Sequence, residues 1–428
     1  MTTAALSLRE LSRRVLDARH GLFRGMGETP RSRQGGDIFI MGGEIVDPKY
    51  FVRLDKRRQT ASSQVAGAGL TRDEALWSAL GEGIERYSAQ IPAKKHIGTY
   101  SELGKRAIDP RDFLFYADRQ YDLPDFPYRR FDPDAVYTWA DTKNLLTGEY
   151  RLAPMQMAAL GAELCEGEAP LCQSISTGIA SHTHAESALL SGLLEVIERD
   201  AFMATWQLRR PPPHIDIEPN LLKALDPRVA ALLCRADLQI KLFLITTNNT
   251  APAVLCTIHR RDRPATAVGA SARLRLRDAI TKATIEAYHT WAWALTLERK
   301  APVALEDIVE FEHHVRHYFE PASQKALSFL GDGEGVLFQD VPDSGPASIE
   351  DLVRALSASG HDVFSVDLTS PDVADLGFVV FRTMVSGMQP LACGVRNYPL
   401  EDRRLRRVAS DWGFPFPRAL NSDPHPFP

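Results

Sequence analysis

The sequence predicts a mixed α+β fold: one large integrated domain in which helices and strands alternate, with an internal pseudo-duplication. Three observations lead to this fold class. Segments with strand-like and helix-like hydrophobic periodicity alternate along the chain. A nine-residue pattern, S-x-x-x-E-x-x-E-R, occurs at residues 78–86 and again at residues 191–199. No charge block or low-complexity linker divides the 428 residues into two clean halves.

The N-terminal region predicts one helix followed by irregular chain. Residues 6–18 are Arg-rich and amphipathic, so we expect a helix there. Glu10 and Asp17 within it argue against a transit peptide, because such peptides avoid acidic residues. Residues 21–43 contain several Gly and Arg and predict mostly loop, with a short edge strand over residues 38–41.

Downstream elements follow from periodicity and from helix-start signals. Thr71 with Glu74, and Thr183 with Glu186, match the capping-box pattern, so both copies of the repeat should be helical. A long helix is predicted from about residue 278 to residue 297. Strands are predicted over residues 136–140, 240–247, 253–258, 362–368 and 378–385.

The repeated pattern places two acids and one base on the same side of each helix. These residues are Glu82, Glu85 and Arg86 in the first copy, and Glu195, Glu198 and Arg199 in the second. A surface ion pair would be the ordinary interpretation, but residues 188–206 are apolar nearly all round, which is typical of a buried helix. Converging buried carboxylates need cations, and Mg²⁺ prefers oxygen ligands. A metal–nucleotide site and a structural ion-pair network both remain open at this point.

Composition excludes several classes of protein. The net charge of -5 provides no basic field for nucleic acid or an anionic membrane. The longest apolar runs are too short to span a bilayer. Five cysteines without a C-x-x-C pair argue against a disulfide framework or a zinc site and favour the cytoplasm. No G-x-x-x-x-G-K-[ST] pattern occurs, so a P-loop is excluded.

Several segments together resemble the YcaO family. They are residues 79–88, residues 176–182 followed by residues 193–201, the Ala279-x-x-x-Ala283-x-x-Glu286-Ala287 pattern, and the closing residues 421–428. The resemblance covers about residues 60–428 and implies a YcaO-like fold. It divides the chain into an N-terminal extension, residues 1–60, and a catalytic domain, residues 61–428, that includes the Pro-rich tail.

The resemblance also implies a site that binds ATP through glutamates and Mg²⁺ without a Walker motif. It identifies Glu82, Glu85, Glu195 and Glu198 as the magnesium ligands around the triphosphate. Arg199 and Arg86 would form a charge clamp on the phosphates. The nucleotide-binding residues would be Ser176, Thr177, Gly178 and Glu286. The chain departs from the family pattern at Ala68, where Lys is frequent, at Ser187, where an acid is common, and at His289, where Gln is usual.

The last five residues, Pro424-His-Pro-Phe-Pro428, favour one branch of the family. A C-terminal P-x-P-x-P is the mark of azoline-forming cyclodehydratases. The alternating prolines hold an extended chain, and the terminal carboxylate of Pro428 would act as a base or orient one. The implied reaction is ATP-dependent cyclodehydration of Cys, Ser or Thr in a ribosomal precursor peptide, which yields a thiazoline or an oxazoline.

The resemblance implies partners as well. Only about sixty residues precede the catalytic region, so we expect a separate ThiF-like protein to recognise the leader peptide, in an oligomeric complex. An azoline oxidase as a further partner is left open. Two alternatives remain: a YcaO enzyme that makes a thioamide or an amidine, and a non-catalytic scaffold subunit. The tail argues against the first, and the four intact glutamates argue against the second.

Overall fold

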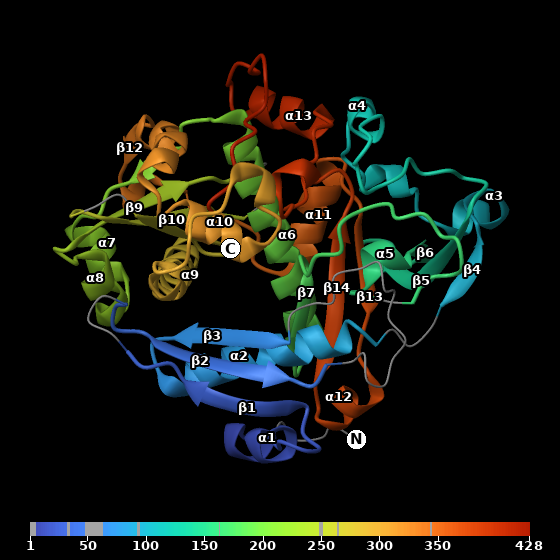
Figure 1. The fold of residues 1–428 in the computed structure, drawn as a ribbon, viewed down its shortest axis with the longest axis horizontal. Coiled ribbons are helices and arrows are strands. Elements are labelled where there is room, and N and C mark those ends of the chain that lie inside the picture. The colour runs from blue at the N-terminus through green and yellow to red at the C-terminus, as the bar shows by residue number, and fades with distance from the viewer. Residues whose placement is uncertain are drawn as a thin grey trace. The chain divides into compact units, whose positions relative to one another are not determined.

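The computed structural model of the protein describes residues 6–31, 35–47, 63–91, 95–161, 163–247, 251–262, 265–342 and 345–428. The chain forms two compact units, each assembled from three stretches. Residues 1–29, 40–196 and 353–388 belong to the first unit, and residues 30–39, 197–352 and 389–428 to the second. Both units contain helices and sheets (Figure 1), which confirms the predicted mixed α+β class.

The first unit contains a three-stranded sheet near the N-terminus. Its strand order is β1 (Phe23–Glu28), β2 (Phe39–Ile45), β3 (Gln64–Gly69), and helix α1 (Leu8–Val15) precedes it. The prediction of loop over residues 21–43 is therefore wrong in large part, and β2 lies in the middle of the sheet rather than at its edge. Glycines in a strand are unfavourable locally, but pairing along the β1–β2 ladder outweighs that preference.

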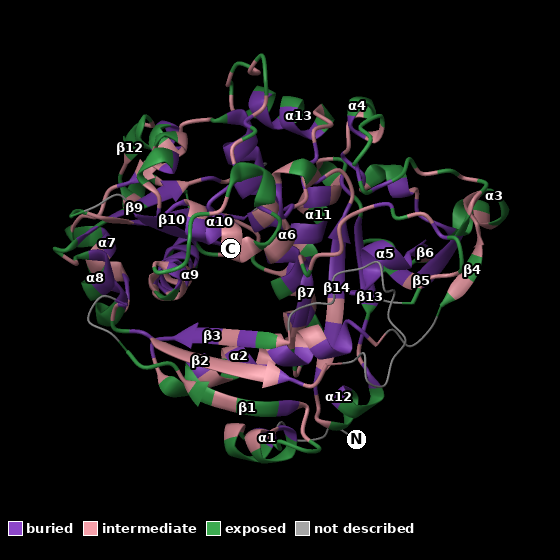
Figure 2. Ribbon diagram, in the orientation of Figure 1, coloured by how far each residue is buried: buried purple, intermediate pink, exposed green. Residues whose placement is uncertain are grey.

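A six-stranded sheet completes the first unit. Its order is β4 (His96–Thr99), β5 (Val136–Asn144), β13 (Val363–Asp367), β14 (Val379–Val385), β7 (Ile179–His182), and β6 (Tyr150–Pro154) pairs with β5. Strands β13 and β14 are largely buried (Figure 2). The helices of this part are α2 (Arg72–Ser88), α3 (Tyr100–Leu103), α4 (Asp118–Tyr121), α5 (Met155–Ala158) and α12 (Pro371–Asp375). Helix α11 (Ile349–Ala358) contributes residues to both units.

The second unit is built on a five-stranded sheet. Its order is β11 (Thr266–Ala272), β10 (Ala253–Arg260), β9 (Leu238–Leu244), β8 (His214–Ile215), β12 (Gly335–Val336). The long helix α9 (Leu276–Leu297) packs on β11 and β10. The remaining helices are α7 (Pro219–Ala224), α8 (Pro227–Leu233), α10 (Phe311–His317) and α13 (Arg403–Asp411). The predicted strands and the long helix are thus confirmed here.

Helix α6 (Ala185–Leu208) carries the second copy of the repeated pattern and contributes residues to both units. Its second half is almost wholly buried, with Phe202, Met203 and Trp206 at most 1% exposed. This burial confirms the prediction that residues 188–206 form a buried helix. Among the described helices, none combines the length and the apolar character that a membrane span requires.

Each unit uses a glycine to bring a strand against a helix backbone. A Cβ atom on Gly67 of β3 would lie 2.2 Å from the backbone nitrogen of Ala79 in α2. A Cβ atom on Gly269 of β11 would lie 2.1 Å from the backbone nitrogen of Ala287 in α9. Glycine is therefore needed at both positions because no side chain fits between strand and helix. The same device in β3–α2 and β11–α9 is consistent with the predicted pseudo-duplication.

We expect Gly269→Ala to lower the free energy of unfolding by about 1–3 kcal/mol, because the added methyl group must push α9 away from β11. Gly25→Ala is the matched control, since a Cβ at Gly25 would meet no atom within 4 Å. Its effect should stay within about 0.5 kcal/mol. Urea denaturation of the two variants measures the difference, and equal stability would contradict the close packing of β11 on α9.

Candidate functional site

Helix α2 positions the first glutamate against strand β3. The predicted capping box is present: the Thr71 hydroxyl accepts from the Glu74 N–H at 3.2 Å, and Glu74 accepts from the Thr71 N–H at 3.2 Å. Nearly two turns before the end of the helix, Glu82 Oε2 accepts from the Ala66 N–H at 2.9 Å. Its other oxygen pairs with Arg86 Nη2 at 2.6 Å. Arg86 thus neutralises Glu82 at i, i+4, as the spacing predicts.

Glu85 lies one turn further along α2 and faces strand β7. Its Oε1 accepts from the Ser181 N–H at 2.9 Å. Burial raises the pKa of Glu85 to about 8, although the Ser181 N–H opposes the shift, and the charges of Glu195 and Glu82 add to it. The structure therefore brings three of the predicted carboxyl groups into one electrostatically coupled set within the first unit.

The predicted nucleotide loop, residues 176–178, lies directly before β7. The Gly178 N–H donates to Glu195 Oε2 at 3.1 Å. Gly178 has a φ of 84°, and a Cβ there would lie 2.2 Å from the Thr383 carbonyl oxygen, so glycine is required. Ser176 is exposed and Thr177 is half-buried. The loop thus holds Glu195 in place through Gly178.

In the second unit, Glu198 and Arg199 occupy the buried part of α6. Glu198 is 7% exposed, and its Oε2 accepts from the Ala272 N–H at the end of β11, at 3.3 Å. Arg199 Nε lies 3.4 Å from Glu198 Oε1. Each of the four predicted glutamates therefore accepts one backbone N–H from a strand or from the loop before a strand. This shared arrangement fixes the carboxylates, and it was not predicted.

Glu286 on α9 has a different environment. It pairs with Lys282 one turn earlier, and His289 Nδ1 lies 3.9 Å from its Oε2. Burial acts to raise the pKa of Glu286, but the Lys282 ammonium and His289 lower it well below its usual range. The carboxylate is thus held ionised by its own helix, and a role in nucleotide binding stays a prediction.

The start of α6 differs from the prediction. The helix begins at Ala185, so its N-cap position is His184 and the Thr183–Glu186 capping box is not formed. The Thr183 hydroxyl instead contacts Nδ1 of His184 at 3.0 Å and Nδ1 of His182 at 3.4 Å. The Thr183 hydroxyl therefore bonds two neighbouring imidazoles instead of the Glu186 N–H that a capping box would use.

The four predicted glutamate ligands have donor atoms that are suitable for a divalent metal ion. They offer carboxylate oxygens, which Mg²⁺ prefers. Burial and the charges of Glu195 and Glu82 disfavour the ionised form of Glu85, and a bound cation would favour it. Within the described residues, however, no three His, Cys, Asp or Glu side chains already stand close enough to hold a metal ion. The ligand set therefore stays a prediction that the donor chemistry supports.

The C-terminal tail is buried from Pro424 to Phe427. Asn421, His425 and Phe427 are at most 4% exposed. The Arg199 guanidinium lies over the Phe427 ring, 4.1 Å from its centroid, which is a cation–π contact. The tail thus places Pro428, the predicted terminal base, next to the residue that contacts Arg199.

Two stacked histidines hold this tail. The rings of His314 on α10 and His425 lie 4.2 Å apart. Burial lowers the pKa of His314 to about 4, and burial with the neighbouring His314 lowers the pKa of His425 well below its usual range. Both imidazoles are therefore neutral in the folded protein near neutral pH. The other charged or titratable groups that affect them are His313, His317 and Arg199.

We expect stability to fall as the pH drops from about 6.5 towards 4, because the unfolded histidines take up protons that the folded ones resist. Stability from this source is fully present above pH 6.5. Each histidine contributes a slope of up to about 1.4 kcal/mol per pH unit. Chemical denaturation at a series of pH values measures the slope. A flat profile between pH 6.5 and 5 would contradict the neutral buried pair.

Sequence reasoning missed one buried ion pair beside the repeated pattern. Asp200 follows Arg199 on α6 and is 0% exposed, and it forms a two-pronged pair with Arg404 of α13, with 2.9 Å between Arg404 Nε and Oδ1. The Gln389 N–H and the Thr247 hydroxyl donate to the same carboxylate at 2.8 Å and 3.2 Å. An acid in an apolar helix was the available signal, but its partner lies 204 residues away.

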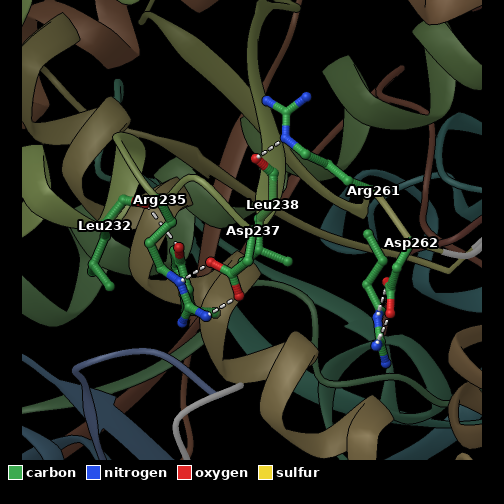
Figure 3. A network of polar contacts seen from close by, with 8 residues as sticks. Leu232, Arg235, Asp237, Leu238, Arg261 and Asp262 are labelled. Carbon is green, nitrogen blue, oxygen red and sulfur yellow. Dashed lines mark hydrogen bonds and ion pairs between the residues drawn. The ribbon is translucent and has the colours of Figure 1, made fainter.

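A separate cavity of about 430 Å³ lies in the second unit, where β9 begins and β10 ends. Figure 3 shows Arg235 directed at Asp237, at 2.5 Å, and Arg261 bonded to the Leu238 carbonyl, at 3.2 Å. Arg260 likewise pairs with Asp262 at 2.5 Å. The lining is Ala236, Asp237, Leu238, Arg260, Arg261, Asp262 and Trp291. It includes none of the predicted site residues, and because its charges largely satisfy one another, we assign it no ligand.

The fold is that of solved heterocyclases. A heterocyclase in complex with substrate and cofactor matches with a TM-score of 0.77 and 20% identity, over 99% of this chain and 57% of that chain. This chain thus spans little more than half of that protein. YcaO from Methanopyrus kandleri, bound with AMPPCP and Mg²⁺, matches with a TM-score of 0.62 and 19% identity, over 89% of this chain and 88% of that chain. The E. coli microcin synthetase McbBCD complex matches at 0.57 and 16% identity, over 94% and 96%.

A match between the sequence and a family model identifies the family of this chain. The model of the family described as YcaO cyclodehydratase, ATP- and Mg²⁺-binding, matches residues 66–389. The chain belongs to the YcaO family, which confirms the resemblance drawn from the repeated pattern. An uncharacterized protein of Methanothermobacter thermautotrophicus is 27% identical over 341 residues, 77% of this chain and 82% of the relative.

Proposed function

We propose that the protein is an ATP- and Mg²⁺-dependent cyclodehydratase that converts Cys, Ser or Thr of a ribosomal precursor peptide into thiazoline or oxazoline. The observation that carries the proposal is the coupled set of Glu82, Glu85 and Glu195. Burial and the charges of Glu195 and Glu82 raise the pKa of Glu85 to about 8, so its ionised form is disfavoured, and a cation bound beside it would favour that form. Together with Glu198, these residues are proposed as magnesium ligands, which matches the family's description as ATP- and Mg²⁺-binding.

The proposed reaction balances as a net loss of water from the peptide. The side-chain thiol or hydroxyl adds to the preceding carbonyl carbon, and its proton passes to a base. The resulting oxygen then takes the γ-phosphoryl group of ATP, and ADP is released as the leaving group. Loss of phosphate and of the amide proton then forms the ring C=N bond. When bound, the nucleotide and the metal would supply the phosphoryl group and compensate its charge.

The residues of this chain would hold and orient the reactants. Arg199 and Arg86 are proposed to face the phosphates, and Arg199 is already oriented by the Phe427 ring. The Pro428 carboxylate is proposed as the base or as the group that orients it, and the buried tail limits its motion. Ser176, Thr177, Gly178 and Glu286 remain the proposed nucleotide contacts.

We further propose residues 61–428 as the catalytic domain, with residues 1–60 as an extension that adds strands β1 and β2 to the sheet of β3. The proposed partners are a precursor peptide and a separate ThiF-like leader-binding protein. The multi-protein complex among the structural neighbours supports such an assembly. All five cysteines are free, which is consistent with the proposed cytoplasmic location.

The test mixes the protein with a candidate precursor peptide, a ThiF-like protein, ATP and Mg²⁺. We expect a loss of about 18 Da per ring with one ADP released for each ring. Loss of thiol alkylation at the modified Cys separates a thiazoline from an amidine, which leaves the thiol free. ATP turnover without a change in peptide mass would contradict cyclodehydration, and no turnover would favour the scaffold alternative.

A further inference from the structure

The C-terminal tail cannot satisfy its own backbone groups. An extended Pro-rich segment has no internal hydrogen bonds, and its prolines have no N–H. Partners must therefore come from elsewhere, because buried carbonyls without donors are costly. Three consecutive tail carbonyls each accept from a buried side chain. One of these side chains comes from α6, and the other two come from α10 and the residue that follows it.

These three donors, together with Tyr398, whose hydroxyl accepts from the tail, form a socket that we define as Trp206, His314, Tyr318 and Tyr398. Trp206 Nε1 donates to the Asp423 carbonyl at 3.0 Å, and the Tyr318 hydroxyl donates to the Pro424 carbonyl. The His425 carbonyl accepts from His314 at 2.8 Å. The His425 N–H donates to the Tyr398 hydroxyl at 2.6 Å. The socket therefore fixes the tail at each residue from 423 to 425.

His314 contacts the tail in two ways. Its Nε2 accepts from the Gly394 N–H at 3.0 Å, so its hydrogen must lie on Nδ1, which donates to His425. Its ring also stacks on the His425 ring, 4.2 Å between centroids. On the far side of His425, Nε2 faces the Ala392 carbonyl at 2.8 Å. The imidazole at 425 is thus held on both its ring face and its edge.

The position of His425 determines where the chain end lies. Pro426 and Pro428 have restricted φ angles, so few torsions remain free beyond residue 425. Phe427 packs on Phe202, 4.8 Å between centroids, and under the Arg199 guanidinium at 4.1 Å. A shift at His425 would therefore move the aromatic face that orients Arg199, and the terminal carboxylate with it.

We propose that His314 is a positioning residue for the reaction: by stacking on His425 and donating to its carbonyl, it sets the placement of Phe427, Arg199 and the Pro428 carboxylate. His314 touches no predicted metal ligand. This inference rests on the proposed function for its catalytic consequence, while the seating of the tail can be measured without any activity.

The test compares a variant of His314 with a variant of His313, its neighbour on the same helix. His314→Gln removes the Nδ1 donor and the ring. His313→Gln is the matched control, because the Nδ1 atom of His313 accepts from the Val309 N–H at 3.3 Å and does not hold the tail. All proteins carry 4-fluorophenylalanine at position 427. We expect the ¹⁹F resonance of His314→Gln to shift or broaden, and that of His313→Gln to match the wild type.

The catalytic arm measures rings formed and ADP released. We expect ring formation by His314→Gln to fall by up to about 100-fold, with more ADP released per ring. That ratio separates misplacement from a loss of folded enzyme, which would lower both rates equally. His314→Asn, which restores an N–H near the Nδ1 position, should recover part of the coupling.

An unchanged ¹⁹F resonance and an unchanged ADP-to-ring ratio in folded His314→Gln would overturn the proposal. If His314→Gln does not fold, Tyr318→Phe replaces it, because it removes one hydroxyl from the same socket and keeps the ring. A wild-type protein that forms no rings would contradict the proposed function, but the ¹⁹F comparison would still decide whether His314 seats the tail.

Discussion

Glu198→Gln is expected to abolish ring formation while the protein keeps its fold. The glutamine side chain has the same size, and its carbonyl oxygen can still accept from the Ala272 N–H. It loses the negative charge that faces Arg199 at 3.4 Å and that the proposed metal ion would need. We expect the rate to fall by at least about 100-fold. Ring formation, Mg²⁺ titration of ATP binding and thermal unfolding together measure the effect.

Glu186→Gln is the matched control for this variant. It makes the same change in the first turn of the same helix, where the side chain is exposed. We expect Glu186→Gln to retain wild-type activity and wild-type metal dependence. Normal activity in Glu198→Gln would remove Glu198 from the proposed metal site. An equal loss in both variants would instead point to an effect on the whole of α6.

Local signals in the sequence predicted local structure well. The α2 capping box forms because its two partners lie three residues apart and need nothing else. The box predicted for α6 fails because His182 and His184 compete for the Thr183 hydroxyl. Strands β1 and β2 were missed because their glycines suggest loop, and only pairing between distant strands makes them extended.

The candidate site was predictable in residue type but not in its surroundings. The repeated pattern indicated which carboxylates to expect, since acids in an apolar helix are unusual. It could not indicate the backbone amides that hold them: the Ser181 N–H that bonds Glu85 lies 96 residues further along the chain. The tail was predicted to be functional, but its donors, such as His314, belong to segments with no motif of their own.

Arg404→Met is expected to lower the free energy of unfolding by about 3–5 kcal/mol. Arg404 is 2% exposed and Asp200 is 0% exposed. Removing the guanidinium leaves a buried carboxylate that accepts from the Gln389 N–H and the Thr247 hydroxyl. Because neither carries a charge, the desolvation of Asp200 is no longer offset. Urea denaturation of the folded protein measures the loss.

Arg406→Met is the control, because Arg406 lies on the same helix but is exposed and pairs with Asp402 at 2.7 Å. Such surface pairs contribute about 0–1 kcal/mol.

The double variant Asp200→Leu, Arg404→Met should recover part of the loss, since it removes the uncompensated charge together with its partner. If Arg404→Met costs no more than Arg406→Met, the pair does not anchor α13. If the double variant is less stable than Arg404→Met alone, the bonds from Gln389 and Thr247 contribute more to that anchor than the ion pair does.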